Sequence, residues 1–336
     1  RSYYTFRRSL SRLGAVLCGH ALAQATNSKY RGYWAQWRRF SKMMCWSPWL
    51  QRVNRSSSNK LAYFAIYLWK YGGNKLHRGN SYSTIQSKLS CILWYHRRFS
   101  GIELVRSPHL TAILQGMKRL SDPVQKKQAV TPAFLRLLRR SLNLSRPRDR
   151  LLWGSVLLAY FFLLRRSEYL TIGKSKKFYC LRAKDVFFTN SKGIPVDATM
   201  ATAVTIGLSG AKNDQYGRGA WRTMHQSGDR SLCPVRALKH LIVARHALNA
   251  TAHKYLCLDL EANTVSEALK ATAARAGVPP MSYSTHSLRV GGATALLTGR
   301  ADTLAIKLLG RWVFRCYEEY PVQAAASTKD LSSRMI

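Results

Sequence analysis

The sequence predicts a mainly α-helical protein with two domains, the second of which carries a small antiparallel β-sheet. Along most of the chain, apolar residues recur at the three- and four-residue spacing of helices. Short runs rich in Thr, Val and Ile, separated by turns, are confined to about 185–225. The 336 residues are enough for about two domains, and a polar segment around Pro123 separates two periodic regions.

The first domain is placed at 1–120 and is expected to be helical. Its first clear helix should follow an N-cap at Thr26 or Ser28. We expect the aromatic face of this helix to lie in the core rather than to stack on nucleic-acid bases. This face consists of Tyr30, Trp34, Trp37 and Phe40. Further helices are expected at 59–71, from Ser83 onward and at 108–120.

Residues 121–130 are expected to link the two domains because they are polar and contain a proline. The second domain, at 131–336, should open with helices at about 131–145 and 148–170. The longest apolar run, Leu151 to Leu164, lies in the second of these helices. It is shorter than the roughly 20 residues that a bilayer span requires, so we expect a buried helix.

Three strands are expected in the second domain, at 185–188, 202–208 and 220–225. The segment 212–219 should form the turn between the last two strands, since it is polar and rich in glycine. Helical periodicity resumes after Pro234 and continues almost to the end of the chain. The strands do not alternate with helices, so no parallel sheet is expected.

The net charge indicates a polyanionic partner, and DNA is the first candidate. The chain has 54 Lys and Arg against 15 Asp and Glu, a formal net charge of +39, and no acidic residue precedes Glu103. Bound phosphates would supply the missing counter-charge. The alternatives are a basic face that is merely solvated, and a membrane surface, which fits less well because the charge is spread through the whole chain. The candidate DNA-binding residues are Arg31, Arg38, Arg39, Lys42, Lys88, Arg97, Arg98 and Arg218.

The cysteines and acidic residues argue against several other chemistries. The seven cysteines are scattered and form no Cys-x-x-Cys pair, which fits a reducing intracellular compartment without disulfides or a zinc ribbon. The sequence has no cluster of Asp and Glu for paired Mg²⁺ and no P-loop for ATP. We therefore expect neither a cofactor nor a metal.

Two candidate phosphate-binding motifs lie in the first part of the second domain. Arg165 and Glu168 are one helical turn apart, so the carboxylate can orient the guanidinium toward a phosphate. A simple surface ion pair is the alternative. Lys212 lies in the expected turn between two strands, where a lysine can reach a DNA groove, although basic hairpins are common.

A third motif follows nearer the C-terminal end. His286 and Arg289 share one face of a helix, where both can grip one phosphate. The alternative is an ordinary helix start that Ser284 or Thr285 caps, with Gly291-Gly292 allowing close helix packing.

Tyr320 is the candidate nucleophile. A Tyr hydroxyl suits an enzyme that forms a covalent phosphodiester and later reverses it. Its ordinary pKa is about 10, so nearby cations must favour the oxyanion. Arg311 and Trp312 precede it at short range, and Tyr317 is the rival nucleophile. Both tyrosines could also be plain helix-face aromatics.

Taken in order, the motifs resemble the active-site set of the tyrosine recombinase (integrase) family, over nearly the whole chain. Through 212–219 and Gly310-Arg311-Trp312 the chain most resembles recombinases of eukaryotic mobile elements, of the crypton and DIRS-like kinds. The resemblance implies a clamp around DNA, made of a helical core-binding domain and an α+β catalytic domain. It also implies a nuclear location. The motifs are Arg165-x-x-Glu168, Lys212, His286-x-x-Arg289, Gly310-Arg311-Trp312 and Tyr320.

The resemblance also implies a role for each of these residues. Arg165 and Arg289 would clamp the phosphate, and His286 would donate to it or carry a proton. Lys212 would protonate the leaving 5′-oxygen, and Tyr320 would be the nucleophile.

The sixth position of the set departs from the family pattern. The family has His or Trp nine residues before the nucleophile Tyr320, where this chain has Arg311, with Trp312 one residue later. Either residue can fill the role, and Trp312 is slightly favoured. Glu168 would orient the site.

The implied activity is site-specific DNA recombination through a 3′-phosphotyrosyl intermediate, without ATP or metal. The implied partners are double-stranded DNA and further copies of the chain, as a homodimer on one site and a homotetramer in the synapse, and no membrane. Two alternatives remain: an enzyme like the type IB topoisomerases, and a catalytically inactive DNA-binding protein derived from a mobile element.

Overall fold

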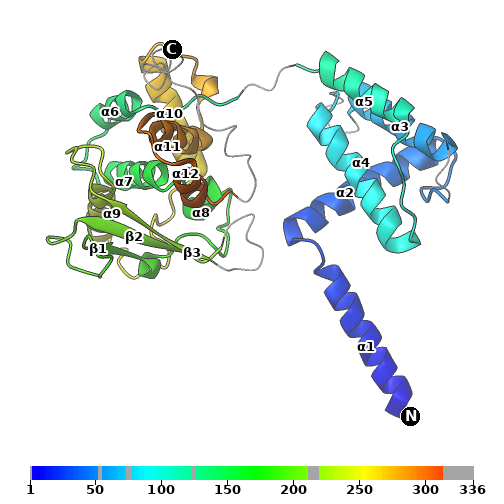
Figure 1. Cartoon of the computed structure of the whole chain (residues 1–336), viewed down its shortest axis with the longest axis horizontal. Coiled ribbons are helices and arrows are strands. Elements are labelled where there is room, and N and C mark those ends of the chain that lie inside the picture. The colour runs from blue at the N-terminus through cyan, green and yellow to red at the C-terminus, as the bar shows by residue number, and fades with distance from the viewer. Residues whose placement is uncertain (1, 52–54, 73–77, 123–125, 211–218, 313–336) are drawn as a thin grey trace, which may run out of the picture. The chain divides into compact units, whose positions relative to one another are not determined.

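A computed structural model describes residues 2–51, 55–72, 78–122, 126–210 and 219–312. The chain divides into two compact units, Arg1–Val124 and Gln125–Ile336 (Figure 1). Each unit has a hydrophobic core of its own. The predicted fold class is confirmed, because helices dominate the described residues and their sheet has three antiparallel strands. In the described part of the chain, no helix is both long and apolar enough to span a membrane.

The first unit is a helical domain whose core forms between α2, α3, α4 and α5. The aromatic face of α2 is in this core, as predicted. Trp37 is fully buried, and its indole Nε1 donates to the Pro48 carbonyl at 2.7 Å. The helices of this unit are α1 (Ser2–Gly19), α2 (Gln24–Met43), α3 (Arg55–Tyr71), α4 (Tyr82–Ser100) and α5 (Pro108–Leu120).

Two features of the first unit differ from the predictions. The helix α2 begins earlier, with Ala23 at its N-cap, so the proposed caps Thr26 and Ser28 were wrong. The helix α1 was not predicted at all. Its described side chains are nearly all exposed, so it lacks the buried face on which a prediction from packing depends.

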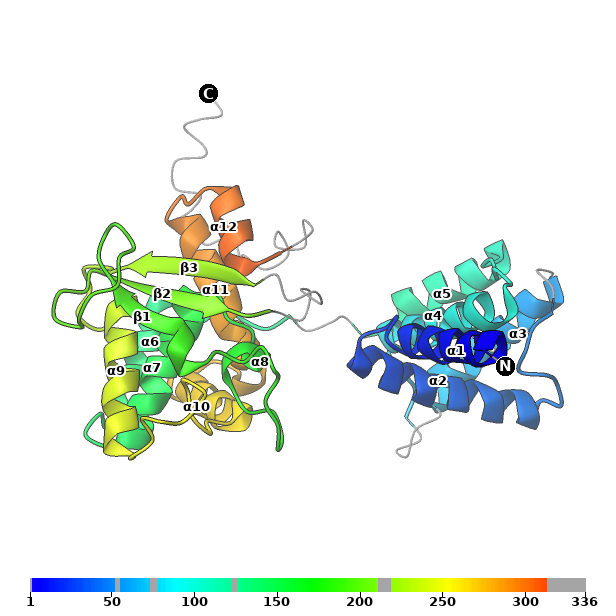
Figure 2. The same ribbon diagram turned by 90° about the horizontal axis from the view of Figure 1, so that it is seen from below.

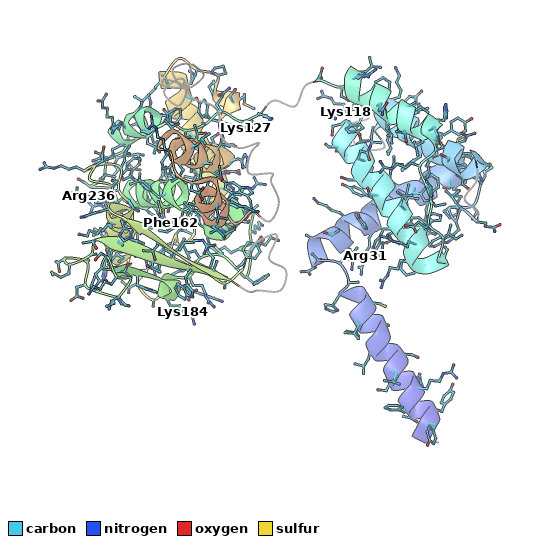
Figure 3. The ribbon with its side chains drawn as sticks, viewed as in Figure 1. Arg31, Lys118, Lys127, Phe162, Lys184 and Arg236 are labelled. Carbon is cyan, nitrogen blue, oxygen red and sulfur yellow. The ribbon has the colours of Figure 1, made fainter. Side chains whose placement is uncertain are left out.

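The second unit packs helices on one small sheet (Figure 2). Its helices are α6 (Pro132–Arg140), α7 (Pro147–Phe161), α8 (Arg166–Tyr169), α9 (Pro234–Ala247), α10 (Ala262–Arg275), α11 (Thr285–Thr298) and α12 (Thr303–Gly310). The apolar run forms α7, which is buried from Leu151 to Tyr160, as predicted. Figure 3 shows Phe162, just after α7, inside this unit, whereas Lys184 and Arg236 lie at its surface.

The sheet has the order β1-β2-β3, with strands β1 (Val186–Thr189), β2 (Ala203–Leu208) and β3 (Ala220–His225). The central strand β2 is buried along its whole length, while β3 alternates between half-buried and exposed residues. Leu208 pairs with Ala220, so the two strands end side by side. The segment between them carries Lys212 and Arg218, which lie outside the described residues.

The helix predicted at 148–170 is broken in two. The helix α7 ends at Phe161, and α8 begins only at Arg166. Between them, Leu163 has a φ of 49°, a left-handed conformation that cannot continue an α-helix. The break makes Arg165 the N-cap of α8 and leaves the carbonyls of Phe162 and Leu163 free of the helix ladder.

The glycine pair of α11 lets this helix approach its neighbours closely. A Cβ at Gly291 would overlap the Val130 backbone, and one at Gly292 would overlap the Tyr160 carbonyl and the Leu163 side chain. Ser284 is the N-cap of α11 and accepts from the His286 N–H at 3.3 Å, so the helix start and close packing named above as the alternative are both present. They do not test whether His286 and Arg289 bind a phosphate.

We expect Gly292→Ala to destabilise the second unit by about 3 kcal/mol, because backbone atoms surround the new methyl group. Hydrogen–deuterium exchange of peptides from α7 and α11 measures the effect separately from the first unit. Gly32→Ala in α2 is the matched control, since no atom lies within 4 Å of its Cβ position. Equal protection in the Gly292 variant and the wild type would contradict the close approach.

Candidate active site

Arg165 and Glu168 form one hydrogen-bonded unit at the start of α8. The Arg165 backbone N–H donates to Glu168 Oε2 at 2.8 Å, and Arg165 Nη1 donates to Glu168 Oε1 at 3.1 Å. Glu168 is fully buried, while the Arg165 side chain keeps 18% of its surface exposed. The carboxylate therefore both caps the helix and fixes the guanidinium, which has further N–H donors besides the one bonded to Glu168.

Arg311 brings the end of α12 to the same carboxylate. Its Nη2 donates to Glu168 Oε2 at 2.6 Å, and its Nη1 donates to the Leu309 carbonyl at 2.9 Å. The side chain is only 9% exposed. Arg311 also ends α12 in a left-handed conformation, with a φ of 55°. Glu168 thus balances two guanidinium groups in a buried place.

Arg289 lies almost fully buried between the ends of α7 and α12, with 1% of its surface exposed. Its Nη1 donates to the Leu163 carbonyl and its Nη2 to the Gly310 carbonyl. Carbonyls at helix C-termini lack partners within the helix and carry partial negative charge, so they suit a guanidinium. The break after α7 is therefore what supplies one of the acceptors.

Trp312 covers the guanidinium of Arg289. The indole ring centroid lies 4.2 Å from Arg289 Cζ, in a cation–π arrangement, and the Trp312 side chain is buried. Gly310 makes this possible, because a Cβ at that position would overlap the indole ring. The three residues of this motif therefore have different roles. Gly310 leaves room for the indole ring, Arg311 bonds to Glu168, and Trp312 covers Arg289.

His286 lies at the start of α11, where its side chain still meets solvent. Partial desolvation, and then the positive charges of Arg289 and Arg165, lower its pKa below the ordinary value of 6.5. The lowered pKa favours the neutral imidazole, which can act as a hydrogen-bond donor or acceptor.

Arg222 connects the sheet to α12, a contact that the sequence did not indicate. From β3, its Nε and Nη2 donate to the Leu308 carbonyl at 3.0 and 2.8 Å. The sequence predicted a strand at this position but no role for Arg222. The alternating direction of side chains along a strand does not show which residue an outward-pointing arginine contacts.

The structure brings five of the predicted site residues together around the ends of α7 and α12. These five are Arg165, Glu168, Arg289, Arg311 and Trp312. Arg165 and Arg311 both bond to Glu168, Arg289 stacks on Trp312, and Arg289 and Arg311 both donate to the Leu163 carbonyl. The charges of Arg289 and Arg165 also act on His286. Lys212, Tyr317 and Tyr320 lie outside the described residues. No group of His, Cys, Asp and Glu among the described residues could hold a metal ion.

The candidate DNA-binding residues of the first unit differ in exposure. Exposed side chains are those of Arg31, Arg38, Arg39, Lys42 and Arg97, and Figure 3 labels Arg31 on α2. Arg98 is half-buried, and its Nη2 donates to the Cys18 carbonyl at 2.6 Å. Lys88 is only 3% exposed and its ammonium faces Asn80, so it does not fit a phosphate contact; burial lowers the pKa of Lys88 to about 8.

Comparison with known proteins shows the fold. No known family profile and no curated protein sequence matches the chain. The integrase of the Tn1549 transposon, solved with transposon right end DNA, matches with a TM-score of 0.56 and 12% identity over 96% of this chain and 97% of that chain. A lambda integrase fragment, solved as a dimer bound to a core site, matches with a TM-score of 0.53 and 16% identity over 94% and 95% of the two chains.

A third solved structure, XerH recombinase bound to its difH substrate after cleavage, matches with a TM-score of 0.52 and 14% identity over 82% of this chain and 70% of that chain. The chain therefore has the fold of the tyrosine recombinases and integrases.

We expect Glu168→Gln to lower the free energy of unfolding by about 3 kcal/mol, because it leaves Arg311 buried without a counter-charge. Adding Arg311→Met should recover part of the loss, since it removes the unmatched charge. Urea unfolding of the single and double variants measures both effects. Glu267→Gln, at an exposed position of α10, is the control and should stay within about 0.5 kcal/mol of the wild type. A double variant no more stable than Glu168→Gln would refute the pairing.

We expect the imidazole of His286 to titrate below pH 6.5, and Arg165→Gln to move its midpoint upward by removing one repelling charge. Because the folded-state pKa is lowered, His286 takes up a proton more readily in the unfolded chain, so its stabilising contribution is present above pH 6.5 and is lost as the pH falls. NMR titration of the His286 ring in both proteins measures the midpoints, and an unchanged midpoint would contradict the geometry.

Proposed function

We propose that this protein is a tyrosine recombinase of a mobile element, which cuts and rejoins DNA through a 3′-phosphotyrosyl intermediate. One observation carries the proposal: Arg165, Arg289 and Trp312 converge with the Glu168–Arg311 pair at one place in a fold shared with DNA-bound integrases. The net charge of +39 supports a nucleic-acid substrate.

In the proposed reaction, Tyr320 attacks a backbone phosphate of the DNA. A bond forms between the Tyr320 oxygen and phosphorus, and the bond from phosphorus to the 5′-oxygen breaks. Lys212 gives a proton to the leaving 5′-oxygen, and the proton of Tyr320 passes to His286 or to water. The reverse attack by a 5′-hydroxyl from the partner duplex rejoins the strands, so the phosphotyrosine conserves the bond energy.

The arginines would stabilise the charge on the pentavalent phosphate. Arg165 is already held by Glu168 with donors to spare. Arg289 donates to two carbonyls at the ends of α7 and α12, which use two of its five N–H donors and fix the plane of its guanidinium. The stacking of Trp312 on Arg289 supports Trp312 as the residue that fills the sixth position, and the bond to Glu168 makes Arg311 a supporting residue.

The proposed partners are double-stranded DNA and further copies of the chain. Solved structures with this fold include a lambda integrase dimer on a core site and a lambda integrase tetramer on a Holliday junction. We propose the same stoichiometries here, a dimer on one site and a tetramer in the synapse. The crypton or DIRS-like kind, and with it a nuclear location, rests on the sequence at 212–219 and Gly310-Arg311-Trp312.

Tyr320→Phe should abolish covalent attachment to DNA while leaving DNA binding unchanged. The assay mixes the full chain with nicked duplexes that carry candidate element ends, in EDTA, and separates the products on a denaturing gel. A DNA-linked band that maps to the Tyr320 peptide in the wild type is the expected result.

Tyr317→Phe is the matched control and should still form the adduct. If the Tyr320→Phe variant still forms an adduct, Tyr320 is not the nucleophile. Tight, salt-sensitive binding without any adduct in the wild type would favour an inactive DNA-binding protein, and relaxation of supercoils by a monomer would favour an enzyme like the type IB topoisomerases.

A further inference from the structure

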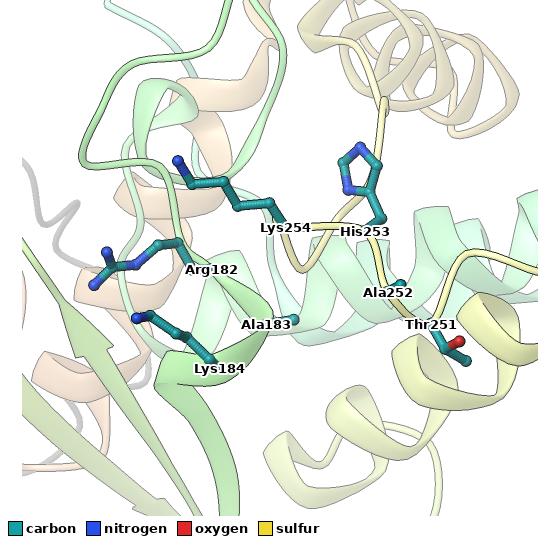
Figure 4. A pocket seen from close by; sticks show the side chains of 7 residues that line it. All are labelled: Arg182, Ala183, Lys184, Thr251, Ala252, His253 and Lys254. Atoms are coloured by element: carbon teal, nitrogen blue, oxygen red, sulfur yellow. The ribbon is translucent and has the colours of Figure 1, made fainter.

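The second unit carries a basic pocket that the proposed catalytic set does not use. Its volume is ≈ 590 Å³, and Figure 4 shows Arg182, Lys184 and Lys254 extending toward the same side of it. The first two side chains come from the segment around the 3₁₀ turn η1 (Ala183–Asp185), just before β1, and the third comes from the loop after α9. Cations from two separate segments thus meet at one place.

The backbone holds these two segments together. The Ala183 N–H donates to the Lys254 carbonyl at 3.0 Å, and the Leu256 N–H donates to the Leu181 carbonyl at 3.1 Å. Arg182 and Tyr255 form an antiparallel bridge between the two segments. The cationic side chains therefore stand on a fixed frame rather than on independent loops.

A buried arginine fixes the loop that carries Lys254. Arg245 of α9 is 4% exposed, and its two terminal nitrogens donate to four carbonyls of this loop at 2.7 to 3.2 Å. Those carbonyls belong to Thr251, His253, Tyr255 and Leu256. The sequence could have indicated this role, because Arg245 lies on the apolar face of α9. A buried arginine is tolerated there only if its N–H groups are hydrogen-bonded.

The cations of the pocket have little counter-charge. Asp185 binds Arg182 Nε at 2.5 Å, which orients the guanidinium and leaves its two terminal nitrogens without a hydrogen bond to the described residues. Lys184 and Lys254 are exposed, and in the part of the chain that the structure describes no carboxylate pairs with either. Lys254 lies over the Tyr255 ring, with Nζ 5.5 Å from its centroid. A bound anion would offset this local excess of positive charge.

We propose that this pocket binds a phosphate group, supplied by the DNA backbone at a position beside the phosphate that is cleaved. The planar guanidinium of Arg182 suits paired phosphate oxygens, and the two lysines add point charges around it. The frame of the pocket continues into the candidate active site, because the Leu181 N–H donates to the Glu168 carbonyl at 2.7 Å. The pocket and the candidate active site therefore belong to the same unit and are joined by the backbone. This inference rests on the proposed function, and free phosphate is the other source of the same chemistry.

The test compares the salt dependence of DNA binding in the full chain. The variant Lys184→Gln with Lys254→Gln removes two exposed charges of the pocket, and Lys192→Gln with Lys270→Gln removes two lysines that do not line it. Fluorescence anisotropy of a labelled duplex over a series of KCl concentrations gives the slope of log K against log [KCl]. We expect the slope of the pocket variant to become shallower by about 1 to 2, since each lost phosphate contact contributes roughly 0.9.

A second arm separates the two sources of phosphate. Tripolyphosphate is added to each protein without DNA, and the melting temperature is measured. A shallower slope in the pocket variant alone supports a backbone phosphate. An unchanged slope, with tripolyphosphate stabilising the wild type and control but not the pocket variant, supports a free phosphate.

If the pocket variant equals the control in both measurements, the inference is overturned. The readout is also independent of the proposed reaction. If the wild type forms no Tyr320 adduct but the slope is still shallower in the pocket variant than in the control, the result counts against recombination and not against the pocket. A wild type that does not bind DNA counts against the proposed function itself.

Discussion

The buried carboxylate of Glu168 is the constraint on which the candidate site depends. It accepts from the Arg165 backbone and side chain and from Arg311, so one negative charge joins the start of α8 to the end of α12. A carboxylate without access to water is tolerated only when it is paired and hydrogen-bonded. The two guanidiniums are therefore fixed in place by the requirement to satisfy Glu168, before any substrate arrives.

The broken helix supplies the other half of the arrangement. A continuous helix from α7 through α8 would use the carbonyls of Phe162 and Leu163 within its own ladder. The left-handed Leu163 releases them, and Arg289 and Arg311 bind there. Helix ends thus act as acceptors for a cluster of like charges that would otherwise repel one another.

Much of this fold could be predicted from the sequence, because the spacing of apolar residues indicates which face of a helix or strand is buried. The core helix α7, the strands of the sheet and the Ser284 cap follow from apolar spacing, β-branched runs and capping chemistry. The break at Leu163 could not be predicted, since the residues there are as apolar as the helix before them. The burial of Lys88 also escaped prediction, because spacing on a helix does not show which long side chain folds inward. The contact of Arg222 could not be predicted either, because its partner Leu308 is distant in sequence.

The hydrogen bonds from Arg222 to Leu308 carry a consequence for regulation. They tie β3, which borders the segment that contains Lys212, to α12, which precedes the segment that contains Tyr320. Through these bonds a ligand that shifts α12 can also act on β3, and any such coupling has the same strength in the reverse direction. If strand and helix move together when DNA binds, the proposed acid Lys212 and the proposed nucleophile Tyr320 would be positioned in the same step.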